Sequence, residues 1–131
     1  MKSVYCDNWE QGKDNGIEIC NPSWDEVKNL ILQLDNDKKT LVTFGDYDMG
    51  YYMAIGGGCD KYILYLSFED EEKIFELVNS EETEECYVEL VVGGQRGRYP
   101  KSSCICQSEV LIAAETFFKY RIPDKNLTWK E

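Results

Sequence analysis

Four apolar runs decide the fold: LVTF (41–44), YYMAI (51–55), YILYLSF (62–68) and YVELVV (87–92). Each run is rich in β-branched, aromatic and aliphatic residues, and turn-forming residues separate one run from the next. Short apolar runs divided by turns are typical of an antiparallel meander, here spanning residues 40–92. We expect Gly56-Gly57-Gly58 to join the second strand to the third.

The fourth run alternates, with Val88, Leu90 and Val92 on one face of the predicted strand. One face therefore points inward, and the other is at least partly in contact with water. Residues 70–79 fit either a short helix or an edge strand, and the sequence leaves both open. Residues 16–20 fit a short strand that follows a turn at Asn15-Gly16.

Ser23 and Glu26 have the spacing of a capping box, with Pro22 at a first helical position. Apolar residues then recur at helical spacing and predict a helix over 23–34 that Asp35-Asn36-Asp37 ends. These residues are Trp24, Val27, Leu30, Ile31 and Leu34.

A second helix is predicted over 109–120, with Ser108 as its cap. Residues 110–114 are all apolar, so more than one face of this helix is hydrophobic and we expect it to lie deep against the sheet. Strands grouped together with a helix on either side predict an α+β fold, an antiparallel meander covered by an N-terminal and a C-terminal helix. A chain of 131 residues is long enough for one core, so we expect a single domain over 1–131.

Charge is distributed unevenly along the chain, whose net charge is −11. Residues 1–92 contain 7 basic and 21 acidic residues, whereas residues 93–131 contain 7 basic and 4 acidic ones. A negative field repels nucleic acid and anionic membranes and speeds the capture of a basic partner. The composition therefore favours a protein that binds a cation-rich surface.

The chain contains no histidine, which removes the commonest acid–base side chain near neutral pH. Residues 1–8 lack the apolar stretch of a signal peptide, so we expect a cytoplasmic protein. The six cysteines are then expected to be reduced and mostly buried.

Several motifs resemble the first immunity-protein family of bacterial polymorphic toxin systems. The carboxy-terminal half is similar in VVGGQ (91–95), Tyr99-Pro100, a helix with Ala113-Ala114 and Phe117-Phe118, and LTW (127–129). The amino-terminal half is similar in WDEV (24–27), which opens a helix that ends at Leu34-Asp35 before strands and a glycine turn. The resemblance extends over about residues 23–130.

This resemblance implies a protein that is encoded beside a toxin and protects the producing cell by binding it. It also loosely implies a toxin that is a nucleic-acid deaminase. The groove of such a toxin, whether it is a deaminase or a nuclease, must be basic to hold phosphates, so an acidic surface can occlude it without any chemistry. The predicted partner is a basic, nucleic-acid-acting toxin domain, with no nucleic acid, membrane or cofactor bound.

Acidic residues gather in predicted turns close to tyrosines, a combination in which carboxylates pair with arginine and tyrosine supplies contact area. Two of these turns hold residues 46–48 and 69–72, and a third acidic run occupies residues 81–85. The predicted partner-binding residues are Asp46, Tyr47, Asp48, Tyr51, Glu69, Asp70, Glu71 and Glu72.

Other patterns carry weaker signals. The segment 93–98 has glycines and arginines without the spacing of a phosphate-binding loop, so a turn between two strands is favoured. Cys104 and Cys106 could point to one side of a strand, but no C-x-x-C pair accompanies them, and Asp46-x-Asp48-x-Gly50 lacks the closing glutamate of a calcium loop. No metal site is predicted.

Two other functions compete with the toxin inhibitor. The first is a small ligand-binding or adaptor module, which a deep apolar cavity on the sheet would favour. The second is an enzyme that uses paired carboxylates, but no acidic pair lies in a context that would raise its pKa.

Overall fold

One large sheet dominates the computed structural model, which describes all of residues 1–131. Its seven strands are β1 (Ser3–Cys6), β4 (Ile17–Cys20), β5 (Leu41–Asp46), β6 (Tyr51–Gly58), β7 (Lys61–Phe68), β8 (Lys73–Leu77) and β11 (Trp129–Lys130). The order across the sheet is β11-β8-β7-β6-β5-β1-β4, and every neighbouring pair is antiparallel. Two further hairpins are β2 (Trp9–Glu10) with β3 (Lys13–Asp14), and β9 (Tyr87–Val92) with β10 (Gln95–Pro100).

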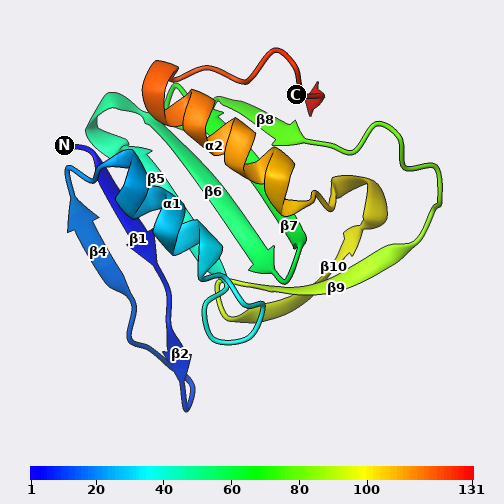
Figure 1. Cartoon of the computed structure of the whole chain (residues 1–131), viewed down its shortest axis with the longest axis horizontal. Helices are drawn as coiled ribbons and strands as arrows, with labels where there is room; N and C mark the ends of the chain where they lie inside the picture. Colours follow the sequence, from blue (N-terminus) through cyan, green and yellow to red (C-terminus); the bar gives the residue numbers. More distant parts are fainter.

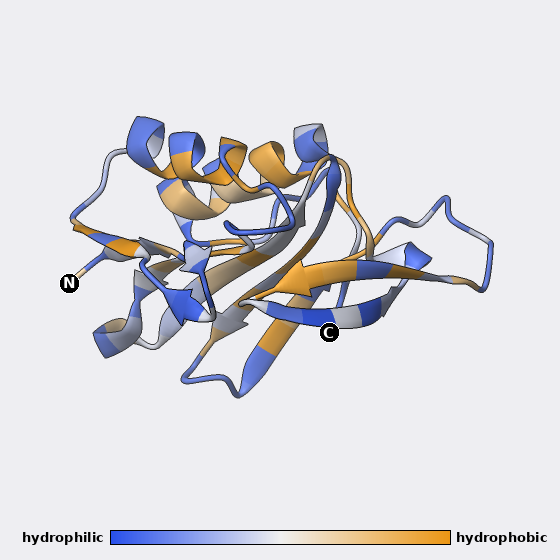
Figure 2. Ribbon diagram, turned by 90° about the horizontal axis from the view of Figure 1, so that it is seen from below, coloured by the Kyte–Doolittle hydropathy of each residue, from blue (hydrophilic) through white to orange (hydrophobic).

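Two helices, α1 (Trp24–Leu32) and α2 (Gln107–Tyr120), lie on the same face of this sheet (Figures 1 and 2). Short 3₁₀ turns, η1 (Tyr47–Met49) and η2 (Lys101–Ser103), follow β5 and β10. The predicted α+β class, an antiparallel sheet covered by an N-terminal and a C-terminal helix, is confirmed. Neither helix has the length and apolar character needed to cross a membrane.

The start of α1 is the predicted capping box. The Ser23 hydroxyl accepts from the Glu26 amide at 3.2 Å, and the Glu26 carboxylate accepts from the Ser23 amide at 2.9 Å. Pro22 precedes this cap and is not a helical residue, which corrects the predicted position. The helix also ends at Leu32, ahead of the predicted stop at Asp35.

The start of α2 differs from the prediction. The helix begins at Gln107, so Ser108 lies in its first turn and does not cap it. The acceptor comes from elsewhere in the chain, because the Gln107 amide donates to the Asp60 carboxylate at 2.8 Å. Asp60 belongs to the turn between β6 and β7, and a contact so distant in sequence has no local signal.

The core lies between the two helices and the sheet. Phe117 of α2 packs edge-on against Phe44 of β5 at 5.7 Å and against Tyr51 of β6 and Phe68 of β7 at 5.8 Å between ring centroids. Trp24, Phe118 and Trp129 pack against this core and are partly buried. Val110, Ala113, Ala114 and Phe117 of α2 are fully buried, as predicted for a helix against the sheet, but Ile112 is 46% exposed, so the run 110–114 does not bury more than one face.

The meander departs from the prediction in two places. Gly56-Gly57-Gly58 belongs to β6, and the turn to β7 is made by Cys59 and Asp60, whose φ angles are 56° and 65°. The fourth strand of the meander is β8, so of the two alternatives for residues 70–79 the strand is correct, over residues 73–77. The strand β9 pairs only with β10. The predicted place of 87–92 in the meander is therefore wrong.

The β9–β10 hairpin lies on the side of the sheet opposite the helices (Figure 2). Gly56 of β6 makes this contact possible, because a Cβ atom there would lie 2.5 Å from a methyl carbon of Val92. Gly93 and Gly94 make the turn of this hairpin, as predicted, whereas residues 95–98 of the predicted turn belong to β10. The hairpin covers one end of the sheet face and leaves the middle of β6, β7 and β8 uncovered.

All six cysteines are free. Only Cys6 is buried, since Cys104 is half-buried and Cys20, Cys59, Cys86 and Cys106 are exposed. The expectation that most are buried is wrong, because these residues lie at strand ends and in connections and not on the core face of an element.

Candidate functional site

The two predicted acidic turns lie at the same end of the sheet. The first joins β5 to β6 and the second joins β7 to β8, and alternate turns of an antiparallel meander fall at the same end (Figure 1). The Asp70 amide donates to the Gly50 carbonyl at 3.1 Å, which holds the turns together. Gly50 has a φ of 79°, a conformation that favours glycine. We call residues 46–50 and 69–72 the acidic end.

Asp46 has a structural task within the acidic end. Its carboxylate accepts from the amides of Asp48 and Met49 at 3.1 and 3.2 Å, which caps η1, and it lies 3.2 Å from the amino-terminal nitrogen. Burial alone would raise the pKa of Asp46, but these donors lower it below its ordinary value. The carboxylate is thus occupied and buried in the free protein.

Tyr51 is also turned inward. It is a core residue beside Phe117, and the Arg121 guanidinium lies 4.8 Å from its ring centroid. By contrast, 55% of Tyr47 and 90% of the Asp48 side chain are exposed. Of the four residues predicted in and after this turn, two face solvent and two face the protein.

The second turn carries Glu69, Asp70, Glu71 and Glu72, and all four are exposed. Glu69, Asp70 and Glu71 have φ angles of 54°, 53° and 74°, and the Glu72 amide donates to the Glu69 carbonyl at 3.1 Å. Three successive non-glycine residues in the left-handed region are costly, and such strain tends to occur at functional sites. The turn presents four carboxyl groups in succession, and no basic residue lies among residues 69–72 to neutralise them.

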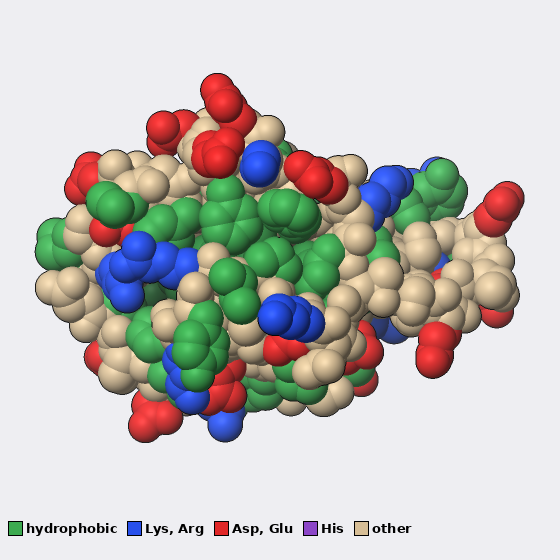
Figure 3. Space-filling model, turned by 90° about the horizontal axis from the view of Figure 1, so that it is seen from above, with side chains coloured by type: hydrophobic (Ala, Val, Ile, Leu, Met, Phe, Trp, Pro, Cys, Tyr) green, Lys and Arg blue, Asp and Glu red, His purple; other side chains and the backbone are tan.

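Figure 3 looks onto the side of the molecule that carries this end. Acidic side chains stand around the rim, hydrophobic side chains gather in the middle, and single basic side chains lie between them.

Three tyrosines lead from the acidic end onto the open face of the sheet. The ring centroids of Tyr47 and Tyr52 are 5.1 Å apart, and those of Tyr52 and Tyr65 are 6.1 Å apart at an interplanar angle of 74°. Burial and the neighbouring Tyr65 raise the pKa of Tyr52 to about 12. The Tyr52 ring therefore stays neutral at physiological pH and offers a face for stacking.

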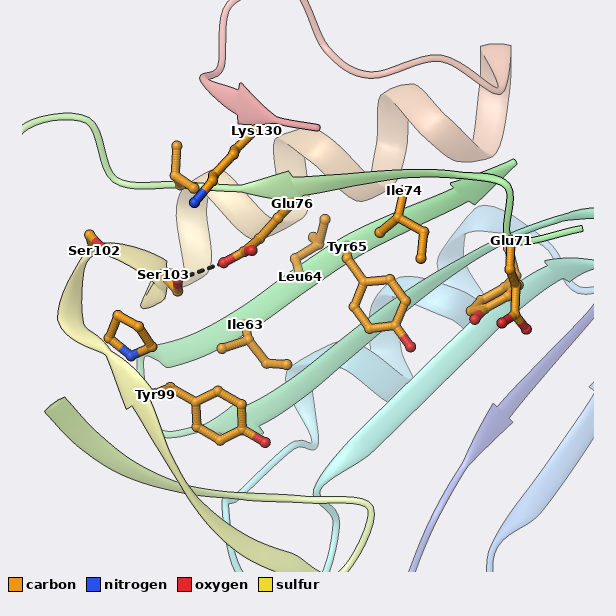
Figure 4. A pocket seen from close by; sticks show the side chains of 13 residues that line it. Ile63, Leu64, Tyr65, Glu71, Ile74, Glu76, Tyr99, Ser102, Ser103 and Lys130 are labelled. Carbon is orange, nitrogen blue, oxygen red and sulfur yellow. Dashed lines mark hydrogen bonds between the residues drawn. The ribbon is translucent and has the colours of Figure 1, made fainter. Parts of the chain in front are cut away.

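Tyr52 and Tyr65 also line a recess of about 610 Å³ between β7, β8 and β10, which we call the trough (Figure 4). Its lining residues are Tyr52, Ile63, Leu64, Tyr65, Glu71, Ile74, Glu76, Val78, Tyr99, Pro100, Ser102, Ser103 and Lys130.

Most of the trough was missed by sequence reasoning, which identified Glu71 and noted Tyr52 near the acidic residues. A signal was present in YILYLSF, because Ile63 and Tyr65 alternate with the core residues Tyr62 and Leu64. A strand that is apolar on both faces must cover something on each side. Tyr99 and Ser103 join the trough only through the path of the hairpin, which local sequence does not indicate.

The third acidic run, residues 81–85, lies apart from the acidic end. It belongs to the connection between β8 and β9 that projects to the right in Figure 1. Lys101 approaches two of its carboxylates, at 3.7 Å from Glu82 and 3.4 Å from Glu84. This run is partly neutralised within the chain.

No group of three or more histidine, cysteine, aspartate or glutamate side chains is placed to hold a metal ion. Three carboxyl groups have a displaced pKa, Asp14, Asp35 and Asp46, and each lies below its ordinary value. A general acid needs the opposite displacement.

Fold and site together define an acidic α+β protein with carboxylates and tyrosines exposed at one end of its sheet. Residues 15–131 match the family Immunity protein Imm1, and the chain belongs to that family. The resemblance stated from sequence is thereby confirmed. Comparisons with curated proteins and with solved structures gave no match.

Proposed function

We propose that this chain neutralises a cognate toxin domain by covering the basic, nucleic-acid-binding surface of that domain with the acidic end. The observation that carries the proposal is the convergence of the two acidic turns, tied by the hydrogen bond from Asp70 to Gly50. Membership of an immunity-protein family supports a toxin as the partner.

Exposure decides which residues of the acidic end take part. Asp48, Glu69, Asp70, Glu71 and Glu72 are exposed, and so is Tyr47. Asp46 and Tyr51 do not contact the toxin in this proposal, because Asp46 caps η1 and Tyr51 packs in the core. Charge steers the encounter and a few desolvated anchors hold the complex, so the inhibitor itself catalyses nothing.

The test uses the purified chain and the toxin domain that is encoded beside it. We expect a stoichiometric complex by size-exclusion chromatography with light scattering, and loss of the toxin's activity on nucleic acid in that complex. Failure to form a complex at micromolar concentration, or turnover of a substrate by the isolated chain, would contradict the proposal.

A ligand-binding module is the second candidate, and the trough is the observation that favours it. Carboxylates at Glu71 and Glu76 and the ammonium of Lys130 line the recess, however, and it is open along one side. An apolar small molecule would leave these charges unpaired. Part of a macromolecule with a charged side chain suits such a lining better.

A further inference from the structure

The middle of the sheet face opposite the helices has no cover of its own. The hairpin packs over Gly56 through Val92, and its Tyr99 and Pro100 form one wall of the trough. Ile63 and Tyr65 form the floor, and Ile74 of β8 is 43% exposed beside them. In Figure 4 the side chains of Tyr65 and Tyr99 extend into the same space, with Ile63 between them.

The two ends of the trough differ in charge. At one end Glu76 accepts a hydrogen bond of 2.5 Å from the Ser103 hydroxyl, and Lys130 lines the same part (Figure 4). At the other end Glu71 is exposed and makes no ion pair within the chain. Neither Glu71 nor Glu76 forms an ion pair, but the one basic side chain of the lining, Lys130, lies at the Glu76 end, so the Glu71 end has no cation beside its carboxylate.

A small recess of about 100 Å³ adjoins the trough at this end. Its lining is Tyr47, Gly50, Tyr52, Asp70 and Glu71, with two carboxyl groups and no basic side chain. Tyr52 and Glu71 line both the trough and this recess, so the two are continuous. Aromatic faces and carboxylates meet at this junction.

We infer that the trough receives an arginine side chain of the toxin at the junction of Tyr52, Tyr65 and Glu71, an inference that rests on the proposed function. A guanidinium group is planar, stacks on tyrosine rings and pairs with carboxylates through two parallel hydrogen bonds. Lysine is a point charge and uses such a site less well. The arginine anchors the toxin on the sheet face, while the carboxylates of the acidic end steer it there.

The first experiment needs no toxin. N-acetyl-arginine amide is titrated into the protein, and the ring signals of its tyrosines are followed by NMR. We expect saturable shifts at Tyr52 and Tyr65 with a dissociation constant on the order of 10 mM, since a single side chain provides little contact. The citrulline amide, which has the same shape without the charge, is expected to cause no saturable shift.

Variants locate the site. Glu71→Gln is expected to weaken binding of the arginine amide about fivefold, as for a partly exposed ion pair. Tyr65→Leu removes the stacking face and is expected to abolish the shift at Tyr52. The matched controls are Glu81→Gln, an exposed acid of the third run, and Tyr87→Leu, an exposed tyrosine whose ring already lies under Arg98 at 5.1 Å. A thermal melt checks that each variant is folded.

Three results of the titrations would overturn the inference. They are equal shifts with the citrulline amide, shifts centred on residues 81–85, and binding that Glu71→Gln leaves unchanged. Light scattering that showed a dimer closed over the trough would do the same, because a second copy would then be the occupant.

A second arm separates this inference from the proposed function. The toxin domain is titrated with the wild type, with Glu71→Gln and with Tyr65→Leu. The affinity of each for the toxin is compared with that of the two control variants. A wild type that fails to bind the toxin contradicts the proposed function. If the wild type binds and the trough variants bind equally well, the arginine site alone is overturned. If the affinity for the toxin falls about tenfold or more in the trough variants only, the arginine site is supported.

Discussion

Asp7 is a buried carboxylate without a basic partner, and hydrogen bonds alone hold it. It accepts from the Thr40 amide at 2.6 Å, the Thr40 hydroxyl at 2.5 Å, the Leu41 amide at 2.9 Å and the Trp9 indole at 2.9 Å. The Thr40 hydroxyl oxygen in turn accepts from the Gly94 amide at 2.9 Å. One side chain thus ties the end of β1 to the start of β5 and, through Thr40, to the tip of the β9–β10 hairpin.

Replacing Asp7 should therefore destabilise the protein strongly. In Asp7→Asn an amide group faces buried donors, and we expect a loss of about 2–4 kcal/mol in the free energy of unfolding. Urea denaturation measures it. The exposed Glu10→Gln serves as control and should stay within about 0.5 kcal/mol of the wild type. If Asp7→Asn left the free energy of unfolding unchanged, these donors would have found other acceptors.

Asp35 orders the loop between α1 and β5. Its carboxylate accepts from the amides of Asp37, Lys38 and Lys39 at 3.0, 3.0 and 2.9 Å. Burial would raise the pKa of Asp35, but the backbone donors outweigh it and lower the pKa below its ordinary value. A lowered pKa means that the ionised form stabilises the folded state.

The consequence is a pH dependence with a defined sign. The contribution of Asp35 is complete above its unfolded pKa of about 3.9 and is lost as the pH falls through the lower pKa of the folded state. Urea denaturation at pH 7, 5 and 3 should show Asp35→Asn less stable than the wild type at pH 7 and 5, with a smaller difference at pH 3. Asp37→Asn, whose side chain accepts no hydrogen bond, should show no such trend, and a constant difference for Asp35→Asn would refute the assignment.

At the scale of elements, the β9–β10 hairpin positions one wall of the trough through contacts outside its own ladder. The Val91 amide donates to the Asn36 side-chain oxygen at 2.7 Å, and Val92 packs on Gly56. Asn36 lies in the same loop that Asp35 orders. The wall therefore depends on a loop more than fifty residues away in sequence.

Gly56→Ala tests this packing. The new methyl group would lie 2.5 Å from a Val92 methyl carbon, so we expect a loss of about 1–3 kcal/mol in the free energy of unfolding and faster hydrogen exchange at the Val91 amide. Adding Val92→Ala should recover part of the loss, because the smaller side chain makes room. Additive effects of the two changes would show that the hairpin does not press on β6 at this point.

Local and distant signals explain which elements could be predicted. The α1 cap was found because Ser23 and Glu26 lie three residues apart, and β5, β6 and β7 were found as apolar runs. The strand β1 was missed, although it pairs with both β4 and β5. SVYC (3–6) is short, and it becomes a central strand only through residues 17–20 and 42–45.

At the scale of the whole molecule, charge governs association. Exposed carboxylates at one end raise the rate at which a basic partner is captured, and added salt screens this effect. Neutralising Asp48, Glu69, Asp70 and Glu72 together should lower the association rate constant for the toxin about 3- to 10-fold at low ionic strength and flatten its salt dependence. Dissociation should change less.

Stopped-flow or surface-based kinetics at several salt concentrations measures this effect. Neutralising Glu81, Glu82, Glu84 and Glu85 is the matched control, because the same number of charges is removed from a connection that lies away from the acidic end. If the control slows association as much as the acidic-end variant, net charge alone and not the acidic end steers the toxin.

The candidate site was predictable in part for the same physical reasons. The acidic turns and Tyr47 follow from composition, since charged residues between strands belong in exposed turns. Sequence did not indicate that Asp46 and Tyr51 face inward, because the amino-terminal nitrogen, Phe117 and Arg121 that surround them come from distant segments. The trough could not be predicted for the same reason, as its walls come from β7, β8 and β10.

The sequence by itself determined the α+β class, the two helices, most strands of the meander, the excess of acid before residue 93 and the kinship with immunity proteins. These properties depend on periodicity, capping and composition, which act over a few residues or over the whole chain. The tertiary structure alone decided that the two acidic turns meet at one end, that β9 leaves the sheet and that an open trough remains on its outer face. Such features arise from contacts between residues far apart in the chain, and neither periodicity nor composition encodes which distant segments meet.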